Sequence, residues 1–359
     1  MSEKKAVLCR NVKIGGGAPV SIQSMTNTPT ADVKATMEQI RRLEEAGCQI
    51  VRMAVPDMEA ARALYDIRKQ TDLPLVADIH FDHRLALEAI RAGMDKIRIN
   101  PGNIGSEDKV KEVVDLAKEY HIPIRVGVNS GSLEKDILQK YGKVTAEGLA
   151  ESALRNVALL EKYDFDDIVI SLKSSNVKMN YEAYKIVNDR SDYPLHIGVT
   201  EAGTPSRGKI KSAAGVGALL LEDIGDTMRI SLTADPVEEV LFAKELLTAL
   251  GLRKDAIEIV SCPTCGRTEV DLEKIAESIE HRIHEVTEKG VCGIKIAVMG
   301  CAVNGPGEAR GADLGVACGK GKGVIFSGGE ILKTVPEEKI ADEIIKLAGE
   351  YDKNTGEFH

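Results

Sequence analysis

The stretch VSIQSMTNTPTADVKATMEQIRRLEEAGCQIVRMAV, residues 20–55, contains the unit from which most of the chain is built. A short run that favours a β-strand, at 20–25, leads through a loop into a helical segment at 33–47, and a second such run follows at 49–55. A strand, a helix and a strand in this order are typical of parallel strands joined by a crossover helix. The stretch therefore predicts an α/β fold with a parallel sheet.

The same unit recurs up to about residue 250. Helical segments lie between eight β-rich runs, which are VSIQSM (20–25), QIVRMAV (49–55), PLVADIH (74–80), KIRINPG (96–102), PIRVGVN (123–129), DIVISLK (167–173), PLHIGVT (194–200) and MRISLTA (228–234). The last helical segment, 236–251, has apolar residues three and four positions apart and ends at a glycine. Eight such units predict a (β/α)8 TIM barrel. A doubly wound sheet is the alternative, and the even number of runs favours a closed barrel.

The pattern changes after Gly251. Two runs that favour strands, AIEIVSCP (256–263) and IKIAVMGC (294–301), lead directly into cysteines, and a helical segment at 270–290 separates them. A glycine-rich segment at 304–329 predicts short strands and tight turns. We therefore expect a barrel domain over residues 1–253 and a smaller α/β domain over residues 254–359.

The composition excludes several classes of protein. The 359 residues carry a formal net charge of −9, and aromatic residues make up 4% with no Trp. An acidic chain with few aromatic side chains is a poor candidate for binding nucleic acid or an anionic membrane. The N-terminus has no apolar signal core and no stretch approaches a transmembrane span, so we expect a cytoplasmic protein.

Three of the seven cysteines form a candidate metal site. Cys262 and Cys265 are a C-x-x-C pair after one expected strand, and Cys301 follows another. A zinc site usually takes a second close pair, and a thioredoxin-type pair would not need the third thiol. Three thiolates with an open or oxygen-filled fourth position suit a catalytic 4Fe–4S cluster. Glu308 is the nearest carboxylate, although on sequence alone it is equally a solvated turn residue.

The remaining cysteines lack a partner at ligand spacing, and a lone cysteine is most often a small buried apolar residue. We expect Cys9, Cys48, Cys292 and Cys318 each to tolerate replacement by Ser or Ala far better than the three candidate ligands, and the sequence assigns no role to Cys292 or Cys318. His196, in the seventh β-rich run, is likewise expected to be a packed strand histidine.

Basic side chains lie in or at the ends of the expected barrel strands: Arg52, Arg98, Arg125, Lys173 and Arg229. Strand periodicity places Asn100 on the same face as Arg98, Asn129 on the face of Arg125, and Asp78 together with His80. A single arginine here is usually an ion-pair partner. Several cations in one barrel mouth need an anion or carboxylates, and Asp78 and Glu201 supply only part of that charge. The pattern indicates a multiply charged substrate such as a phosphate or diphosphate.

These residues together resemble the bacterial 4-hydroxy-3-methylbut-2-enyl diphosphate synthase family of the non-mevalonate isoprenoid pathway. The resemblance covers nearly the whole chain and is carried by QSMTNTPTADV, VRMAVP, ADIHFD, KIRINPGNIG, IRVGVNSGSL, ISLKSS, HIGVTEAG, RISLT, SCPTCGR and GCAVNGPGE. It implies a TIM barrel followed by a domain similar to the α/β modules of sulfite and nitrite reductases. It also implies a 4Fe–4S cluster held by Cys262, Cys265, Cys301 and Glu308.

The reaction that the resemblance implies is a two-electron reductive opening and dehydration. The substrate is 2-C-methyl-D-erythritol 2,4-cyclodiphosphate and the product is (E)-4-hydroxy-3-methylbut-2-enyl diphosphate. Flavodoxin or ferredoxin would deliver the electrons, and a homodimer would share each active site between chains.

Each singled-out residue then has an expected role. The diphosphate is expected to contact Arg52, Arg98, Asn100, Arg125, Asn129 and Lys173, with Arg229 and Ser231 as further contacts. Glu201 and Glu308 are the expected catalytic carboxylates, Glu201 as a proton donor or base, and Asp78 and His80 are expected to orient the substrate.

Two other functions remain open from the residues alone. A redox-silent barrel lyase or transferase could use the basic mouth for a phosphorylated substrate and keep the cysteines for a structural metal. A metal-stabilised binding or scaffold module is the third possibility.

Overall fold

The computed structural model describes residues 4–253, 255–287, 290–301, 311–352, 355 and 357–358. The chain divides into two compact units, which we call the barrel unit, Met1–Leu246, and the C-terminal unit, Leu247–His359. The sequence-based boundary between residues 253 and 254 stays a prediction.

Eight parallel strands form the barrel unit's sheet: β3 Ser21–Met25, β4 Ile50–Ala54, β5 Leu75–Asp78, β6 Lys96–Ile99, β7 Ile124–Asn129, β8 Ile168–Lys173, β9 His196–Ile197 and β10 Thr227–Met228. Their spatial order is β8-β7-β6-β5-β4-β3-β10-β9. A parallel bridge between Ile170 and Leu195 links β8 to the start of β9, so the sheet closes on itself. The predicted TIM barrel is confirmed.

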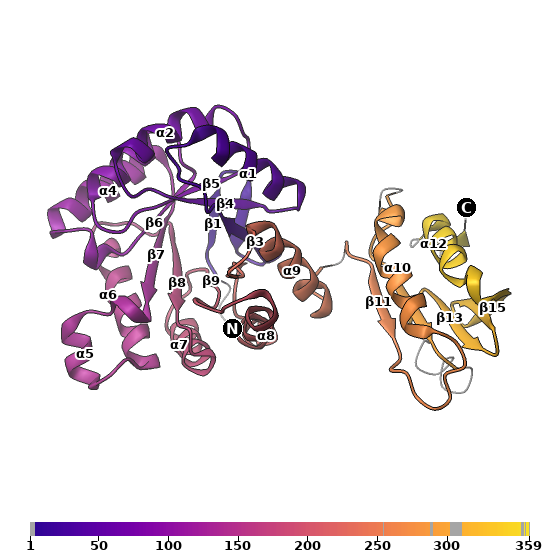
Figure 1. Ribbon diagram of the computed structural model, residues 1–359. Coiled ribbons are helices and arrows are strands. Elements are labelled where there is room, and N and C mark those ends of the chain that lie inside the picture. The colour runs from indigo at the N-terminus through magenta and orange to yellow at the C-terminus, as the bar shows by residue number, and fades with distance from the viewer. Residues whose placement is uncertain are drawn as a thin grey trace. The chain divides into compact units, whose positions relative to one another are not determined.

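Helices lie around the outside of these strands (Figure 1). They are α1 Val33–Glu45, α2 Met58–Arg68, α3 His83–Arg91, α4 Glu107–Tyr120, α5 Lys135–Tyr141, α6 Ala146–Glu161, α7 Val177–Arg190, α8 Pro205–Leu220 and α9 Pro236–Ala249. The first three begin at aspartates, because Asp32, Asp57 and Asp82 each accept a backbone N–H of the first turn. These caps fix where each loop from the barrel mouth turns into its helix.

A hairpin closes the end of the barrel at which the strands begin. The sequence pattern does not predict this hairpin. Strands β1 Ala6–Cys9 and β2 Val12–Gly15 pair antiparallel. The hairpin's Val7, Cys9 and Ile14 are buried against residues near the starts of the barrel strands, Ile50, Val76 and Val169. Because this end is sealed by apolar packing, the opposite end is left for chemistry.

Lys96, the first residue of β6, is 0% exposed, and its ammonium group has no hydrogen-bond partner among the described residues. Burial is the main reason that the pKa of Lys96 falls to about 8. Cys9 raises this pKa, Arg125 and Arg52 lower it further, and Asp95 raises it. The fold therefore carries a buried lysine that is more easily deprotonated than the same residue in the unfolded chain.

We expect Lys96→Met to stabilise the protein by up to about 3 kcal/mol at pH 7. Between pH 8 and 10.5 the unfolded chain holds a proton that the folded chain has lost, so wild-type stability rises with pH across this window. Below pH 8 both states are protonated and the folded state carries the full penalty. Chemical denaturation at several pH values measures both effects. A variant that is less stable than wild type at pH 7 would contradict this account.

The C-terminal unit has a five-stranded mixed sheet in the order β11-β12-β13-β14-β15. Its strands are β11 Glu258–Ser261, β12 Lys295–Met299, β13 Leu314–Gly319, β14 Lys322–Ser327 and β15 Glu330–Pro336, and its helices are α10 Leu272–Thr287 and α12 Ile340–Glu350. The strands β11, β12 and β13 are parallel, and the rest pair antiparallel. The predicted smaller α/β domain is confirmed.

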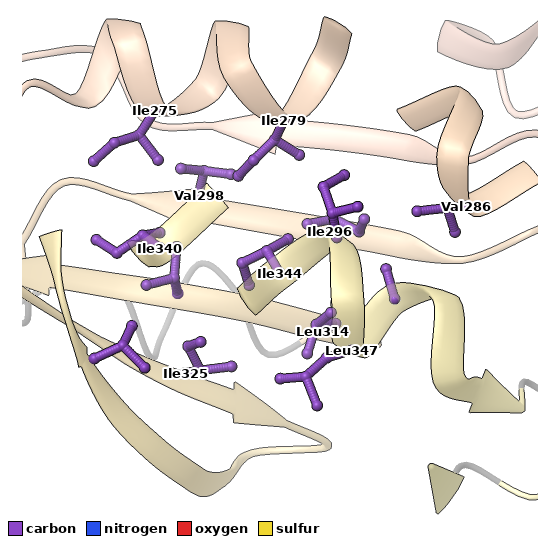
Figure 2. Close-up of a cluster of buried hydrophobic side chains, with 14 of the residues drawn as sticks. Ile275, Ile279, Val286, Ile296, Val298, Leu314, Ile325, Ile340, Ile344 and Leu347 are labelled. Carbon is purple, nitrogen blue, oxygen red and sulfur yellow. The ribbon is translucent and has the colours of Figure 1, made fainter. Parts of the chain in front are cut away.

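One face of this sheet is covered by the two helices. Figure 2 shows Ile275 and Ile279 of α10 and Ile344 of α12 pointing toward Ile296 and Val298 of β12. A smaller cluster, which contains Ala297, Met299 and Phe326, forms separately. Cys262 is partly buried against both clusters, so the core of this unit positions the first cysteine of the C-x-x-C pair.

Candidate functional site

The basic residues predicted from the sequence share the inner face of the barrel. Arg98 lies opposite Asp78 on one neighbouring strand and opposite Arg125 on the other, while Asn129 lies opposite Lys173. Since side chains alternate along a strand, residues in this register point to the same side of the sheet. The structure thus brings together side chains that are far apart in sequence.

A network around Asp78 organises one side of the mouth. Arg98 Nη1 donates to Asp78 Oδ1 at 3.3 Å and lies 3.3 Å from Nδ1 of His80. Arg52 Nε lies 3.6 Å from Asp78 Oδ2, and His80 Nε2 lies 3.6 Å from the same oxygen. Burial alone would raise the pKa of Asp78, but Arg52, His80 and Arg98 outweigh burial and hold it well below its usual range. Asp78 is therefore an anion that holds two cations in place.

Arg229 is held by a carboxylate that the sequence analysis did not identify. Its Nε and Nη2 donate to Glu239 at 3.1 and 3.2 Å. Glu239 belongs to α9, is buried, and also accepts hydrogen bonds from Ser24 Oγ and the backbone N–H of Leu232. An acidic residue in the first turn of an amphipathic helix normally faces water, so only its place in the helical repeat could have indicated its inward direction.

Among the described residues, no carboxylate forms an ion pair with Lys173 or Arg125. The side chain of Lys173 is buried. Burial, and then the charges of Arg52 and Arg125, lower the pKa of Lys173 well below its usual range. Arg125 is 0% exposed, and none of its three guanidinium nitrogens has a partner among the described residues. Arg125 is the second residue of β7 and so lies deeper than the mouth.

His196 is a packed strand histidine, as predicted. Its ring is fully buried, and neither ring nitrogen has a partner in the described ranges. Burial, followed by Arg125 and Lys173, lowers its pKa well below the usual value, so the imidazole is neutral.

The balance of charge in the barrel favours an anion. Two buried carboxylates, Asp78 and Glu239, are outnumbered among the described residues by Arg52, Arg98, Arg125, Lys173 and Arg229 and by the buried Lys96, two residues before Arg98 on β6. A cavity of about 220 Å³ opens beside Asp78 and His80 and is also lined by Ala54, Val55, Pro56, Phe81, Asp82 and Leu85. A multiply charged anion that reached this network would supply the missing negative charge.

The other predicted residues of the barrel unit lie outside the network of ion pairs around Asp78 and Glu239. Asn100 is buried, and its side chain accepts the backbone N–H of Gly102, so part of it caps a turn. Asn129 and Ser231 are half-buried at the strand ends. Glu201 is exposed, with a left-handed φ of 51°, and forms no ion pair with any described residue. Glu239, and not Glu201, supplies the second carboxylate beside the cations.

The C-x-x-C pair and Cys301 lie at one edge of the sheet in the C-terminal unit. Cys262 directly follows β11, and Cys301 comes two residues after β12, which is its parallel neighbour. The Cys262 sulfur accepts the backbone N–H of Gly300 at 3.1 Å. Hydrogen bonds from Arg267, first from its backbone and then from its side chain, lower the pKa of the exposed Cys265 thiol. The lowered pKa favours the thiolate form of Cys265, which is the form that binds metals.

A formed metal site is not present in the described ranges, where no three His, Cys, Asp or Glu side chains lie close enough to hold a metal ion. Glu308 lies outside the described residues. The other cysteines differ from the candidate ligands: Cys9, Cys48 and Cys318 are buried, and burial raises the pKa of each thiol, to about 12 for Cys48 and Cys318. Cys292 is exposed.

Comparison with solved structures supports the barrel. Dihydropteroate synthase from Stenotrophomonas maltophilia matches 68% of this chain and 97% of its own with a TM-score of 0.51 at 14% identity. A truncated 3-deoxy-D-arabino-heptulosonate 7-phosphate synthase from Thermotoga maritima matches 69% of this chain and 94% of its own with a TM-score of 0.50 at 15% identity. At such low identity these matches show the fold alone.

Comparison with curated proteins is far more specific. Proteins named 4-hydroxy-3-methylbut-2-en-1-yl diphosphate synthase (flavodoxin) are 57% identical in Fusobacterium nucleatum and 59% identical in Clostridium perfringens. Each match covers 96% of this chain, and 97% and 98% of the relative, respectively. The family models described as GcpE TIM-barrel domain and GcpE protein C-terminal domain match residues 4–244 and 258–350. The chain belongs to the GcpE family.

Proposed function

We propose that this chain is a 4-hydroxy-3-methylbut-2-enyl diphosphate synthase. It converts 2-C-methyl-D-erythritol 2,4-cyclodiphosphate to (E)-4-hydroxy-3-methylbut-2-enyl diphosphate by two-electron reduction and loss of water. The names of relatives that align over nearly the full chain support this reaction. The observation that carries it is the excess of cations over carboxylates in the barrel interior, because a cyclic diphosphate would supply the negative charge that these cations lack.

The donor set fits a 4Fe–4S cluster held by Cys262, Cys265, Cys301 and Glu308. Thiolates are the usual ligands of such clusters, the Gly300 N–H already points at the Cys262 sulfur, and the pKa of Cys265 is lowered. A bound cluster would supply the two electrons of the reaction. We assign the cluster to residues 254–359 and the diphosphate to residues 1–253.

The barrel residues bind and orient the substrate. We infer that diphosphate oxygens contact Arg52, Arg98 and Lys173, with Arg125, Asn100, Asn129, Arg229 and Ser231 as further contacts. The burial of the first three and the strand register support this assignment. Asp78 and His80 hold the guanidinium of Arg98 in place. Glu201, exposed just beyond β9, is the proposed proton donor or base.

Arg98→Ala is expected to raise KM for the cyclodiphosphate roughly tenfold to more than a hundredfold, because a charge-assisted contact to an anion contributes about 1.5–3 kcal/mol. Asp78 keeps Arg52 as a partner, so the fold should survive. Steady-state kinetics with iron content as a control measures the effect. An unchanged KM with normal iron would return Arg98 to a structural ion-pair role.

The partners follow from the same reaction. Flavodoxin is the proposed electron donor, since the relatives' names include it, and ferredoxin is the alternative. We also propose a cytoplasmic homodimer in which each active site takes the barrel of one chain and the cluster domain of the other. Among the described helices, none combines the length and apolar character needed to cross a membrane.

Anaerobic purification separates the reaction from the two alternatives. The proposed enzyme should be brown and contain about four iron atoms per chain. A colourless, iron-free protein that acts on a phosphorylated substrate would instead be the redox-silent lyase or transferase. A protein that binds metal but turns over no substrate would be the scaffold module.

A further inference from the structure

Strand β7 carries a glycine at a position where the backbone does not require one. Gly127 is the fourth residue of Ile124–Asn129 and lies opposite Ser171 of β8. Its φ is outside the left-handed region. A glycine inside a strand weakens it, and where the backbone is ordinary the usual reason is the close approach of another group.

The group that approaches Gly127 is the guanidinium of Arg98. A Cβ built at residue 127 would lie 2.7 Å from Nη2 and 2.8 Å from Cζ of Arg98, and closer still to Nε. The same guanidinium donates from Nη2 to the Gly127 carbonyl oxygen at 3.2 Å. Arg98 therefore lies across the space that the missing side chain leaves.

The other contacts of Arg98 fix the same orientation. Nη1 is shared between Asp78 and His80, each at 3.3 Å, while Nη2 is held by Gly127. A methyl group at residue 127 would push the guanidinium off its carbonyl acceptor and disturb its contact with Asp78. All three nearest atoms belong to the end of one flexible side chain, so Arg98 would move before the strand does.

We propose that Gly127 is a positioning residue for the anionic substrate: by leaving out a side chain, it sets the direction in which Arg98 presents its guanidinium. This inference rests on the proposed function, since it takes the cyclodiphosphate as the anion that Arg98 meets. Gly127 touches Arg98 and acts through it.

Gly198 differs from Gly127 in the group that a new side chain would meet. A Cβ at Gly198 would lie 2.6 Å from the backbone oxygen of Arg229 and 3.3 Å from Nζ of Lys173. Backbone cannot rotate away as a side chain can, so a methyl group there strains the barrel itself. At Gly127 the effect on the cation is separable from the effect on the fold.

The test compares Gly127→Ala, Arg98→Ala, the double variant and Gly217→Ala. Gly217, in α8, is the matched control, because its new Cβ would meet only Leu246 Cδ1 at 3.8 Å. Calorimetric titration of the cyclodiphosphate into oxidised, anaerobically prepared enzyme measures affinity without turnover. We expect Gly127→Ala to weaken binding about tenfold or more, as loss of a charge-assisted contact would. Gly217→Ala should bind as wild type does.

The double variant identifies the route of the effect. If Gly127 acts through Arg98, adding Gly127→Ala to Arg98→Ala changes affinity no further, whereas a separate structural role gives additive losses. Unchanged binding by Gly127→Ala, or additive losses, would overturn the proposal. If Gly127→Ala alone fails to fold, the double variant, which lacks the clashing guanidinium, must recover the wild-type melting temperature, or the proposal is wrong.

Failure of the proposed function has a different signature. Wild type and Gly217→Ala would then both fail to bind the cyclodiphosphate. Titration of the same four variants with inorganic pyrophosphate would still measure whether the effects of residues 127 and 98 on anion affinity are additive.

Discussion

Replacement of Cys262, Cys265 or Cys301 by Ser is expected to remove the cluster and abolish turnover. Each of these variants would lose one of the three proposed thiolate ligands, and a serine hydroxyl is a poor substitute for a thiolate on iron. Iron and sulfide content, measured after anaerobic purification, reports the cluster, and product formation reports turnover. Cys292→Ser is the control, since its exposed thiol lies in the same unit and is not a proposed ligand.

The three cysteine variants are judged separately. Any one that retains both normal iron content and activity is not a ligand, and the donor set proposed above would be wrong at that position. Loss of iron in Cys292→Ser would show instead that the unit tolerates no change of its thiols.

Mixed dimers of Arg98→Ala chains and Cys301→Ala chains, assayed at a substrate concentration well below the raised KM of Arg98→Ala, are expected to regain activity that both parent dimers largely lack. Barrel active sites lie at the carboxyl ends of the strands, and the last barrel helix returns the chain to the opposite end. Few residues separate the end of α9, Ala249, from the start of β11, Glu258, so we propose that the partner's cluster domain completes each site. Two-fold symmetry allows such reciprocal contacts to close.

The arithmetic of the mixed dimer makes the result decisive. If sites form between chains, one site carries both defects and the other carries neither, so about half of the wild-type activity returns. If each chain completes its own site, both sites stay broken. Co-expression with two affinity tags isolates the mixed species, and activity is compared with each parent. No recovery in verified mixed dimers would exclude the shared site.

The barrel could be predicted because its signal is repeated. Seven of the eight β-rich runs contain an observed strand, although β9 has only two residues where its run has seven. The eighth run, 228–234, begins where β10 ends and shares only Met228 with it. The β1–β2 hairpin was not foreseen, because four-residue strands are too short for a reliable alternation. Its function in sealing the barrel depends on contacts with Ile50, Val76 and Val169, which no local pattern reveals.

The sequence predicted which residues belong to the candidate site, but it did not predict which of their side chains contact one another. The structure brings Asp78, Arg98 and Arg125 into register across neighbouring strands. Strand periodicity grouped side chains only within single strands: Asp78 with His80, Arg98 with Asn100 and Arg125 with Asn129. It could not show that Glu239 reaches inward from α9 to hold Arg229, because a helix offers several faces and tertiary packing selects one. It also could not show that Gly127 makes room for Arg98, since this contact is a matter of a few ångströms between strands.

We propose that one chain combines a diphosphate-binding barrel with a redox cluster. Anaerobic incubation of the purified enzyme with 2-C-methyl-D-erythritol 2,4-cyclodiphosphate and a low-potential reductant tests it most directly. We predict that (E)-4-hydroxy-3-methylbut-2-enyl diphosphate forms, with two electrons consumed for each product molecule. An enzyme with its full iron content that leaves the cyclodiphosphate unchanged under these conditions would contradict the account.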